Sequence, residues 1–235
     1  MSWFIYDHPH SIVFEECRSP NRNRMFRDVI NDHHSYVDYT DVPQRRINWL
    51  IYETLSGNLI GAIGISSAVL AIKVRDDFIG WNMETRLSNL NKVANNYRFA
   101  TIKENITIDC AGSTILKSLR HNSKSRWKEK YNDPLVLLET YVKPPWKGTV
   151  YKADNWQHVG RTKGISIKRA PIKLWQREDS IRGRLARENP QEAVKRYASK
   201  GSGLHYNTAV TTKKEIFVRH LTSDWKQQLT QQNRV

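Results

Sequence analysis

The sequence predicts an α/β protein built on a mixed, largely antiparallel twisted sheet that is flanked by helices. Residues 46–54 read as a strand, Gly57-Asn58 gives a turn signal, and residues 59–66 return as a second strand, which together predict a β-hairpin. Residues 135–142 form an apolar run that is typical of a buried strand. Segments with helical and strand periodicity alternate after the hairpin, and this order is typical of an α/β fold.

The remaining elements follow from the spacing of apolar residues. Met25, Phe26, Val29 and Ile30 fall on one face of a helix predicted over 21–32. The first 20 residues mix apolar and polar side chains and are expected to form a strand or an ordered arm on the core. Further helices are expected at 85–93, 111–119 and 123–131 and around Tyr151, and further strands at 69–74, 97–102, 157–162 and 215–220.

We expect a single domain over residues 1–235, because this length suits one core with decorations. Residues 165–210 are predicted to form a basic helical insertion before the last strand, with helix dominating 175–199. The glutamine-rich tail, residues 226–235, is expected to be flexible.

The net charge of +15, from 38 Lys and Arg against 23 Asp and Glu, indicates a polyanionic partner. Nucleic acid is the commonest polyanion in a cell, and we expect DNA. The charge is uneven, since residues 161–200 hold twelve basic and four acidic residues and carry +8 by themselves. A solvated basic surface is the alternative explanation. The residues assigned to nucleic-acid binding are Arg161, Lys163, Lys168, Arg169, Lys173, Arg177, Arg182 and Arg184.

Composition excludes several classes of protein. No apolar run approaches the ~18 residues of a membrane span, and the first residues lack the basic and apolar regions of a signal peptide. Cys17 and Cys110 are too few for a disulfide framework. We therefore expect a cytoplasmic protein with no membrane partner. His33 and His34, with His8, His10 and the nearby Asp32, could bind a transition metal. Adjacent histidines on a helix end point apart, however, so no metal site is assigned, and His34 is assigned to substrate contact.

A short helix followed directly by an exposed strand is predicted around Tyr151. Val150, Ala153 and Trp156 form a narrow apolar stripe at helical spacing, and Tyr151 stands just beside it. Asn155 tolerates the left-handed turn that closes a helix. This layout resembles the last motif of GNAT acyltransferases, the GCN5-related superfamily, in which a tyrosine precedes by five residues an aromatic that opens the next strand.

The resemblance implies a catalytic role for Tyr151, since the tyrosine of the superfamily commonly protonates the leaving thiolate of coenzyme A. It also implies an acyl-CoA or related acyl donor as the cofactor. We assign the neighbouring Asn155 and Trp156 to the substrate site, although Asn155 stands where a glycine is usual. The alternative is a half-buried tyrosine that only packs.

The loop Asp109-Cys-Ala-Gly-Ser-Thr114 lies where a GNAT fold places its pyrophosphate loop, between a strand and a helix. The free amides of a helix start attract phosphate, and a glycine allows close backbone approach. The usual pattern, an Arg or Gln followed by two glycines, is missing, and a plain helix N-cap is the alternative. The resemblance thus implies coenzyme A binding by Ala111, Gly112, Ser113 and Thr114.

Three polar residues at the start of the strand expected at 97–102 can hold a planar ligand. Asn95, Asn96 and Arg98 offer two amides and a guanidinium for hydrogen bonds to a base or an amide, although Asn-Asn pairs are also ordinary turn residues. Glu139 lies within the apolar run, where a carboxylate is costly unless it is paired or lines a cleft. It is either a general base that works with Tyr151 or a structural partner of an arginine such as Arg98.

Tryptophans offer a second route to base recognition. Trp81, Trp127, Trp146, Trp156 and Trp175 are expected mostly in the core or its shell. One that is exposed among basic residues could stack on an extruded base, but the sequence does not say which.

An ordered series of motifs runs from about Val29 to Leu221. It comprises Arg75-Asp76, Ile79-Gly80-Trp81, Arg86, Asn89-Leu90, Val93–Phe99, Leu137–Val142, Gly148–Tyr151, Ala153, Asn155-Trp156, Gly160, Thr162, Gly164 and Lys213-Lys214-Glu215. On these residues the chain resembles DruA-type proteins, the family named after a component of the Druantia anti-phage defence system. Other defence-system or phage proteins are implied as partners. The order of elements also resembles Mom, a phage DNA-modifying protein with a GNAT-type fold.

These observations lead us to expect a GNAT-like transferase that modifies a nucleobase in nucleic acid, with a link to phage or mobile-element conflict. Tyr151 would be the general acid, Glu139 the base or an orienting group, and the basic insertion would hold the polyanion. A non-catalytic nucleic-acid-binding component of a defence system is the first alternative. An acyltransferase that acts on a protein or a small molecule, with the charge incidental, is the second.

Overall fold

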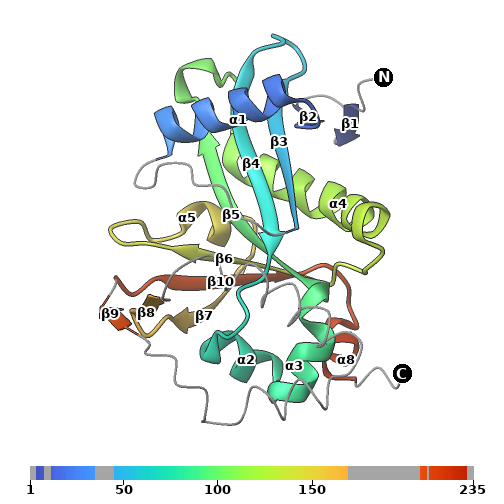
Figure 1. Cartoon of the computed structure of the whole chain (residues 1–235). Helices are drawn as coiled ribbons and strands as arrows, with labels where there is room; N and C mark the ends of the chain where they lie inside the picture. The colour runs from blue at the N-terminus through green and yellow to red at the C-terminus, as the bar shows by residue number, and fades with distance from the viewer. Residues whose placement is uncertain (1–3, 8–11, 35–44, 169–206, 211, 232–235) are drawn as a thin grey trace.

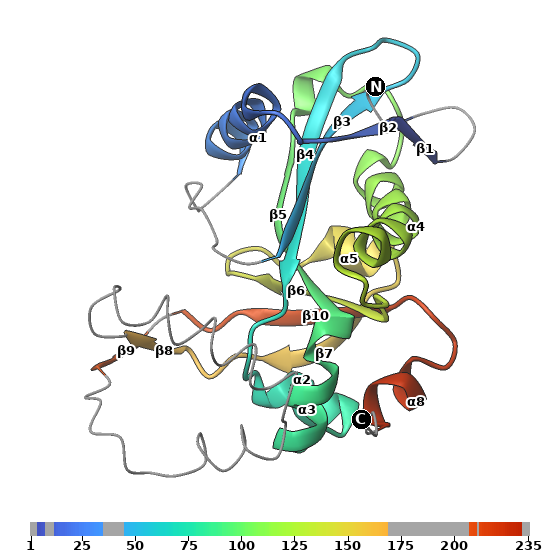
Figure 2. The same ribbon diagram turned by 45° about the vertical axis from the view of Figure 1, so that its right-hand side comes forward.

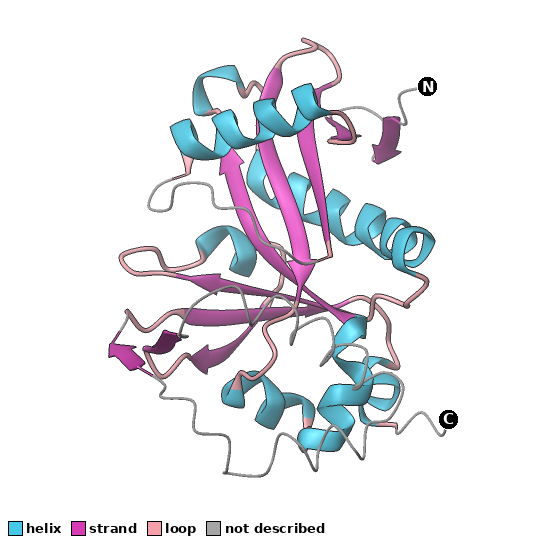
Figure 3. Cartoon of the chain, in the orientation of Figure 1, coloured by secondary structure: helices cyan, strands magenta, loops and turns pink. Residues whose placement is uncertain are grey.

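A computed structural model describes residues 4–7, 12–34, 45–168, 207–210 and 212–231. Its main feature is an eight-stranded sheet in the order β1-β2-β3-β4-β5-β6-β10-β7, in which β5 and β6 are parallel and the other neighbours are antiparallel. Helices lie on both faces of this sheet (Figure 1 and Figure 3). The predicted fold class, a mixed and largely antiparallel sheet flanked by helices, is confirmed.

The strands of the sheet are β1 (Phe4–Asp7), β2 (Ile12–Glu16), β3 (Arg46–Glu53), β4 (Leu59–Ser67), β5 (Val93–Thr101), β6 (Leu137–Val142), β7 (Gln157–Arg161) and β10 (Glu215–His220). A second, two-stranded sheet contains β8 (Ile165–Lys168) and β9 (Asn207–Val210). The helices are α1 (Pro20–His33), α2 (Lys73–Ile79), α3 (Met83–Asn89), α4 (Ala111–Tyr131), α5 (Thr149–Ala153) and α8 (Trp225–Thr230), with short turns η1 (Leu90–Lys92) and η2 (Lys103–Asn105). Among the described residues, no helix combines the length and the apolar character that crossing a bilayer would require.

The sheet divides into two halves between β5 and β6. These strands pair only over Val93–Asn95 and Leu137–Glu139 and then diverge. As a result, β6, β10 and β7 run across the direction of β3, β4 and β5 (Figure 1 and Figure 2). Beyond Asn95 and Glu139, contacts between β5 and β6 must therefore come from side chains.

Helices α1 and α4 cover opposite faces of the half that contains β3, β4 and β5. Phe26 and Ile30 of α1 pack with Leu50 and Ala62 on one face. Apolar residues of α4 pack with Trp49 on the other face. Because side chains alternate along β3, Leu50 and its neighbour Trp49 supply apolar surface to both sides of the sheet.

Two helical layers also enclose the half that contains β6, β10 and β7. Along β6, Leu138 and Thr140 face α4 and α5, whereas Leu137 and Glu139 face α2 and its neighbours α3 and α8. Adjacent residues of a strand point to opposite faces. The side chains of Glu139 and Thr140 therefore lie on opposite faces of the sheet, although the two residues are neighbours in sequence.

The strand expected at 69–74 is wrong. The chain forms a loop there and then the helix α2, whose buried face includes Arg75 and Ile79 at helical spacing. The apolar residues that suggested a strand, Val69 and Leu70, are 43% and 47% exposed.

Two other boundaries also differ from the sequence predictions. The helices expected at 111–119 and 123–131 are one continuous helix, α4, because buried residues recur through its middle. β5 begins before the expected residue 97, so Asn95 and Asn96 lie inside the strand and are not turn residues.

The ends of the predicted basic insertion are strands. β8 and β9 pair in antiparallel register, with Ile165 opposite Val210 and Lys168 opposite Asn207. The helix expected at 175–199 lies outside the described residues. The insertion therefore leaves and rejoins the described fold through a two-stranded ladder.

The tail from Lys226 was expected to be flexible, and for the residues described up to 231 this is wrong. They include most of α8, in which Leu229 is fully buried in a cluster with Ile79 and Trp81. The indole Nε1 of Trp81 donates a 2.6 Å hydrogen bond to the Leu229 carbonyl, and Trp225 stacks on Phe78. Trp225 and Leu229, four residues apart, thus anchor this short helix together with the hydrogen bond from Trp81.

Replacing Leu229 by Ala is expected to lower the free energy of unfolding by about 2–5 kcal/mol, because it removes buried apolar atoms and leaves a cavity beneath α8. Urea denaturation followed by circular dichroism measures the change. Leu55, which is 85% exposed in the β3–β4 turn, provides a matched control. Its replacement by Ala should alter stability by less than about 0.5 kcal/mol. Equal stability of the two variants would contradict the packing of α8.

Candidate functional site

Tyr151 lies where β5 and β6 diverge. α5 carries it over the face of the sheet that α4 also covers, and its side chain joins the core cluster there. Its hydroxyl donates a 2.7 Å hydrogen bond to Oδ1 of Asn96 on β5, and the residue is 8% exposed. Asn96 directly follows Asn95, the last residue of β5 that pairs with β6. A side chain on α5 thus reaches across to β5 just beyond the end of the backbone ladder.

Asn96 is held in one orientation by two backbone carbonyls. Its Nδ2 donates to the carbonyl oxygens of Gly64 and Arg98, each at 3.0 Å, so Oδ1 is the atom that faces Tyr151. Thr140 of β6 completes the array, because its Oγ1 lies 3.0 Å from the Asn96 carbonyl and 3.4 Å from the Tyr151 hydroxyl. Because the two carbonyls occupy Asn96 Nδ2, the Tyr151 hydroxyl meets an acceptor and must be the donor of their hydrogen bond.

A β-bulge places these groups. The register between β4 and β5 passes from Gly64 opposite Arg98 to Ile65 opposite Asn96, which makes Tyr97 the extra residue of a bulge. The bulge brings the carbonyl of Arg98 within reach of the Asn96 side chain two residues earlier. Local irregularity in β5 is thus part of how the array is built.

Aromatic rings surround the Tyr151 side chain. The ring of Trp156 meets it edge to face at 5.0 Å between centroids, and the ring of Phe217 lies nearly parallel to it at 6.0 Å. Gly148, with φ of 66°, begins α5 so close to β10 that a Cβ there would lie 2.5 Å from the Phe217 ring. Only glycine suits this position, because both the left-handed backbone and the close approach exclude a side chain.

Polar contacts fix the far end of α5. Trp156, which is 3% exposed, donates from Nε1 to Asp154 at 2.9 Å. Arg120 of α4 donates two hydrogen bonds, of 2.9 and 2.7 Å, to the same carboxylate. Trp156 therefore packs and does not line an open substrate site as assigned. Thr140, Arg120 and Asp154 escaped the sequence analysis, and the position of Thr140 within the matched Leu137–Val142 motif was the one available signal.

Asn155 has the left-handed backbone expected of it, with φ of 56°. Its carbonyl accepts a hydrogen bond from Arg219 at 3.0 Å, and its side chain is exposed. The residue therefore closes α5, and its assignment to substrate binding gains no support from its position.

The four residues assigned to coenzyme A form the first turn of α4. No side chain caps this turn at Cys110, and Ser113 donates to the Cys110 carbonyl at 2.9 Å. Gly112 lies against α5, where a Cβ would come within 2.6 Å of Val150, the residue before Tyr151. Its small size thus allows α4 and α5 to pack closely. Ala111 is buried, and Thr114 is already bonded through its amide to the Cys110 carbonyl.

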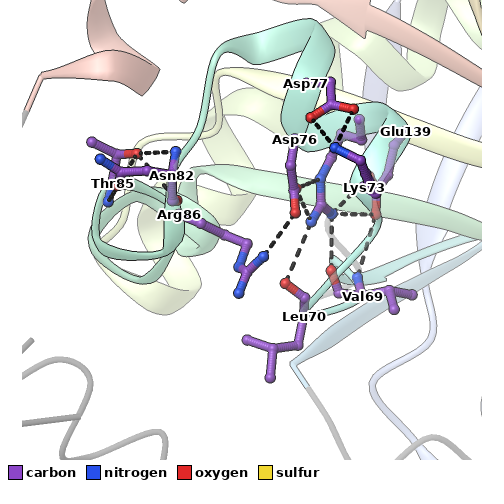
Figure 4. Close-up of polar contacts among 10 residues, drawn as sticks. Val69, Leu70, Lys73, Asp76, Asp77, Asn82, Thr85, Arg86 and Glu139 are labelled. Atoms are coloured by element: carbon purple, nitrogen blue, oxygen red, sulfur yellow. Dashed lines mark hydrogen bonds and ion pairs between the residues drawn. The ribbon is translucent and has the colours of Figure 1, made fainter. Parts of the chain in front are cut away.

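Glu139 belongs to the opposite face of β6. Its carboxylate accepts hydrogen bonds from Arg75 Nη1 at 3.0 and 3.3 Å and from the Val69 amide at 3.3 Å (Figure 4). It also accepts a hydrogen bond of 2.6 Å from the Tyr141 hydroxyl. The side chains of Arg75 and Glu139 are both fully buried. The expected acid–base pair of Glu139 with Tyr151 is wrong, because the carboxylate is committed to Arg75 on the other face.

The ion pair continues into α3. Arg75 binds the Asp76 carboxylate at 2.9 and 2.8 Å, and the other oxygen of Asp76 accepts from Arg86 at 2.9 Å (Figure 4). Burial opposes the charged form of Arg75, but the negative charge of Glu139 and the contacts with Asp76 together outweigh it and raise the pKa of the guanidinium. Burial and Glu139 together raise the pKa of Tyr141 well above its usual value. The arginine partner of Glu139 is thus Arg75 and not Arg98.

Asn95 and Asn96 do not act as a pair. Asn95 is the register partner of Glu139 and lies on the Arg75 face, while Asn96 lies on the Tyr151 face. The Oδ1 atom of Asn95 is buried with no hydrogen-bond partner among the described residues.

Cationic side chains gather at the open end of the divergence. Lys143 follows β6 and Lys214 precedes β10, and the β6–β10 register sets them beside each other. Burial and then the positive charges of Lys143 and Arg98 lower the pKa of Lys214. Burial and Arg98 likewise lower the pKa of His34. Arg98 thus lies near enough to His34 for its charge to act on the imidazole.

The residues assigned to nucleic-acid binding divide into three groups. Arg161 is bound through Nε to the Glu215 carboxylate at 2.5 Å, while its side chain stays 68% exposed. Lys163 is exposed, and Lys168 ends β8. Arg169, Lys173, Arg177, Arg182 and Arg184 lie outside the described residues. In the described ranges, no three His, Cys, Asp or Glu side chains come together in a way that could hold a metal ion.

Replacing Glu139 by Leu is expected to lower the free energy of unfolding by about 3–5 kcal/mol, because it leaves the buried Arg75 charge with fewer partners. A double variant, Arg75→Met with Glu139→Leu, removes both charges and should regain most of that loss. Urea denaturation of the wild type and the variants measures the coupling. A single variant as stable as the wild type would show that this pair does not hold β6 to α2.

The family model described as Druantia protein DruA matches residues 11–231. A curated relative, the Druantia protein DruA of Escherichia coli (strain UMEA 4076-1), is 38% identical over 53 residues. That alignment covers 23% of this chain and 13% of the curated protein, well under two thirds of its length.

Solved structures of acyl-transferring enzymes are among those similar to the chain. FeeM, an N-acyl amino acid synthase from uncultured soil microbes, is 10% identical with a TM-score of 0.47, and the match covers 92% of this chain and 93% of that chain. Spermidine N-acetyltransferase SpeG from Vibrio cholerae is 9% identical with a TM-score of 0.44, covering 91% and 95%. MesI, a CoA-dependent acyl-homoserine lactone synthase, is 10% identical with a TM-score of 0.37, covering 88% and 84%.

The resemblance predicted from the motifs between Val29 and Leu221 is confirmed by the family match, which extends a little beyond them at both ends. Because that match takes in most of the sequence, the chain belongs to the Druantia protein DruA family.

Proposed function

We propose that this chain is a GNAT-like group transferase that modifies a nucleobase in nucleic acid, with DNA the expected substrate. The observation that carries the proposal is the array of Tyr151, Asn96 and Thr140 at the divergence of β5 and β6. The array holds one phenolic hydroxyl in a defined orientation among aromatic neighbours. A positioned proton donor, shielded from water, is what general acid catalysis requires.

Tyr151 is the proposed donor of a proton to the leaving group. In the described arrangement its hydroxyl points to Asn96, so it must rotate away from that oxygen in order to act. Asn96 cannot stabilise the resulting phenolate, because its Nδ2 is already shared between two carbonyls. The Thr140 hydroxyl, 3.4 Å from the tyrosine oxygen, is the group that can turn to donate to it.

An acyl-CoA or related acyl donor is the proposed cofactor. Ala111, Gly112, Ser113 and Thr114 would hold it, since the first turn of α4 carries no side-chain cap and helix N-termini favour phosphate. Gly112 touches Val150, so this turn lies beside the helix that carries Tyr151. When bound, such a donor supplies a thioester and a thiolate leaving group.

Nucleic acid is the proposed partner because of charge. The chain carries +15, and cations gather at the ends of β6 and β10, near the divergence. Arg98 and His34, which lie in the same cationic region, are proposed to contact the substrate. The link to phage or mobile-element conflict, and to other proteins of a defence system, is proposed from the family alone.

A non-catalytic nucleic-acid-binding component of a defence system is the second candidate. The observation that favours it is the completeness of the polar array, since the Tyr151 hydroxyl is buried and already bonded. The one carboxylate proposed as a base, Glu139, is neutralised by Arg75. On this account the array only holds the two halves of the sheet together.

Nucleoside mass spectrometry of DNA and RNA from cells that express the wild type is the test. A new nucleoside mass is expected, and Tyr151→Phe should lower its amount by about 100-fold or more, the usual contribution of a general acid. Tyr52→Phe, in a half-buried tyrosine of β3, is the matched control and should leave the amount unchanged.

Binding of labelled DNA by the same purified proteins separates the two candidates. A Tyr151→Phe protein that binds DNA as the wild type does, but makes no modified nucleoside, supports catalysis. Wild-type levels of modification in this variant would refute the role of Tyr151. DNA binding with no new nucleoside from any protein would favour the binding component.

A further inference from the structure

Trp146 is the exposed tryptophan of the described chain. It is 49% exposed, whereas Trp81, Trp127 and Trp156 are at most 7% exposed. It lies in the loop between β6 and α5, whose residues 144–147 are all exposed. Tryptophan is enriched at interaction surfaces because it joins a large apolar ring to a polar N–H group, so Trp146 is a candidate contact for a ligand.

The loop presents the indole from a firmly held backbone. The amide of Trp146 donates to the Lys143 carbonyl at 3.2 Å, which closes a turn. Pro144 and Pro145 restrict φ before it, and Gly148 packs on Phe217 after it. A ligand that stacks on Trp146 therefore orders little of the loop on binding, which keeps the entropic cost low.

Lysines surround this loop. Lys143 and Lys147 flank the turn, and Lys147 is exposed. Across the β6–β10 ladder, Glu215 pairs with Val142, so Lys214 lies beside Lys143. Lys213, the residue before Lys214, is exposed. Figure 1 and Figure 2 both show the loop at the same end of the sheet as the start of β10. The lowered pKa of Lys214, caused by burial and by Lys143 and Arg98, agrees with this crowding of positive charge.

We infer that Trp146 is a stacking platform for an unpaired base of a single-stranded nucleic acid, and that Lys143, Lys147, Lys213 and Lys214 hold the flanking phosphates. An indole ring stacks on the face of any base, while ammonium groups attract the backbone on either side. In a duplex that face is covered by the neighbouring base pairs. This inference rests on the proposed function in taking nucleic acid as the partner. It adds that the substrate is bound single-stranded or with its base extruded, next to the helix that carries Tyr151.

Fluorescence anisotropy with labelled oligonucleotides at fixed salt tests the inference. Trp146→Ala is expected to weaken binding of oligothymidylate by about 5- to 100-fold, the range of a single stacked base, with little change for a duplex. Trp146→Phe should restore most of the affinity, because a phenyl ring also stacks. A backbone of the same length without bases should bind the wild type about as weakly as oligothymidylate binds Trp146→Ala.

Leu55→Ala, in an exposed residue of the other half of the sheet, is the control for loss of apolar surface and should bind as the wild type does. Equal losses for single strands and duplex, or no loss for either, would overturn the inference. Stacking that depends on Trp146 in a protein that makes no modified nucleoside would leave this inference standing and refute only the proposed chemistry. An oligouridylate measured in parallel shows whether the site also takes RNA, and stacking on either polymer supports the inference.

Discussion

β5 and β6 share a backbone ladder only as far as Asn95 and Glu139, and the other layers of the molecule are arranged around the point where it stops. On one face, Glu139 accepts hydrogen bonds from Arg75 and so ties β6 to α2. On the other face, the next residue, Thr140, donates to the Asn96 carbonyl and ties β6 to β5. Because side chains alternate along a strand, two adjacent residues of β6 thus make these contacts on opposite faces of the sheet, at the point where the strands diverge.

The contacts at the divergence of β5 and β6 are polar, so the stability of the fold and the proposed chemistry depend on the same groups. Buried polar groups are costly unless each has a partner, so the groups at the divergence depend on one another. The hydroxyl of Tyr151 is both a member of this array and the proposed acid. Its release from Asn96 during a reaction would cost about as much as a net hydrogen bond, roughly 0.5–1.5 kcal/mol, which is small beside a catalytic barrier.

Local features were predictable from the sequence because they depend on neighbouring residues. The hairpin and the short helix before a strand follow from apolar spacing, and the left-handed backbone of Asn155 follows from its residue type. The partner of Glu139 was not predictable, since Arg75 is 64 residues away and directly follows a segment that reads as a strand. Which face of β6 a carboxylate serves depends on the register of a parallel pair, and no single segment encodes that. The anchoring of Leu229 depends in the same way on helices far from it in sequence.

The β8–β9 ladder has a consequence for how proteins of this family can diverge. Lys168 and Asn207 are register partners, so the chain between them leaves and returns at one point of the fold. Changes in the length or composition of residues 169–206 therefore need not alter the register of β7 with β10 or the position of α5. Selection can thus rewrite much of the basic segment while the framework around Tyr151 stays constant.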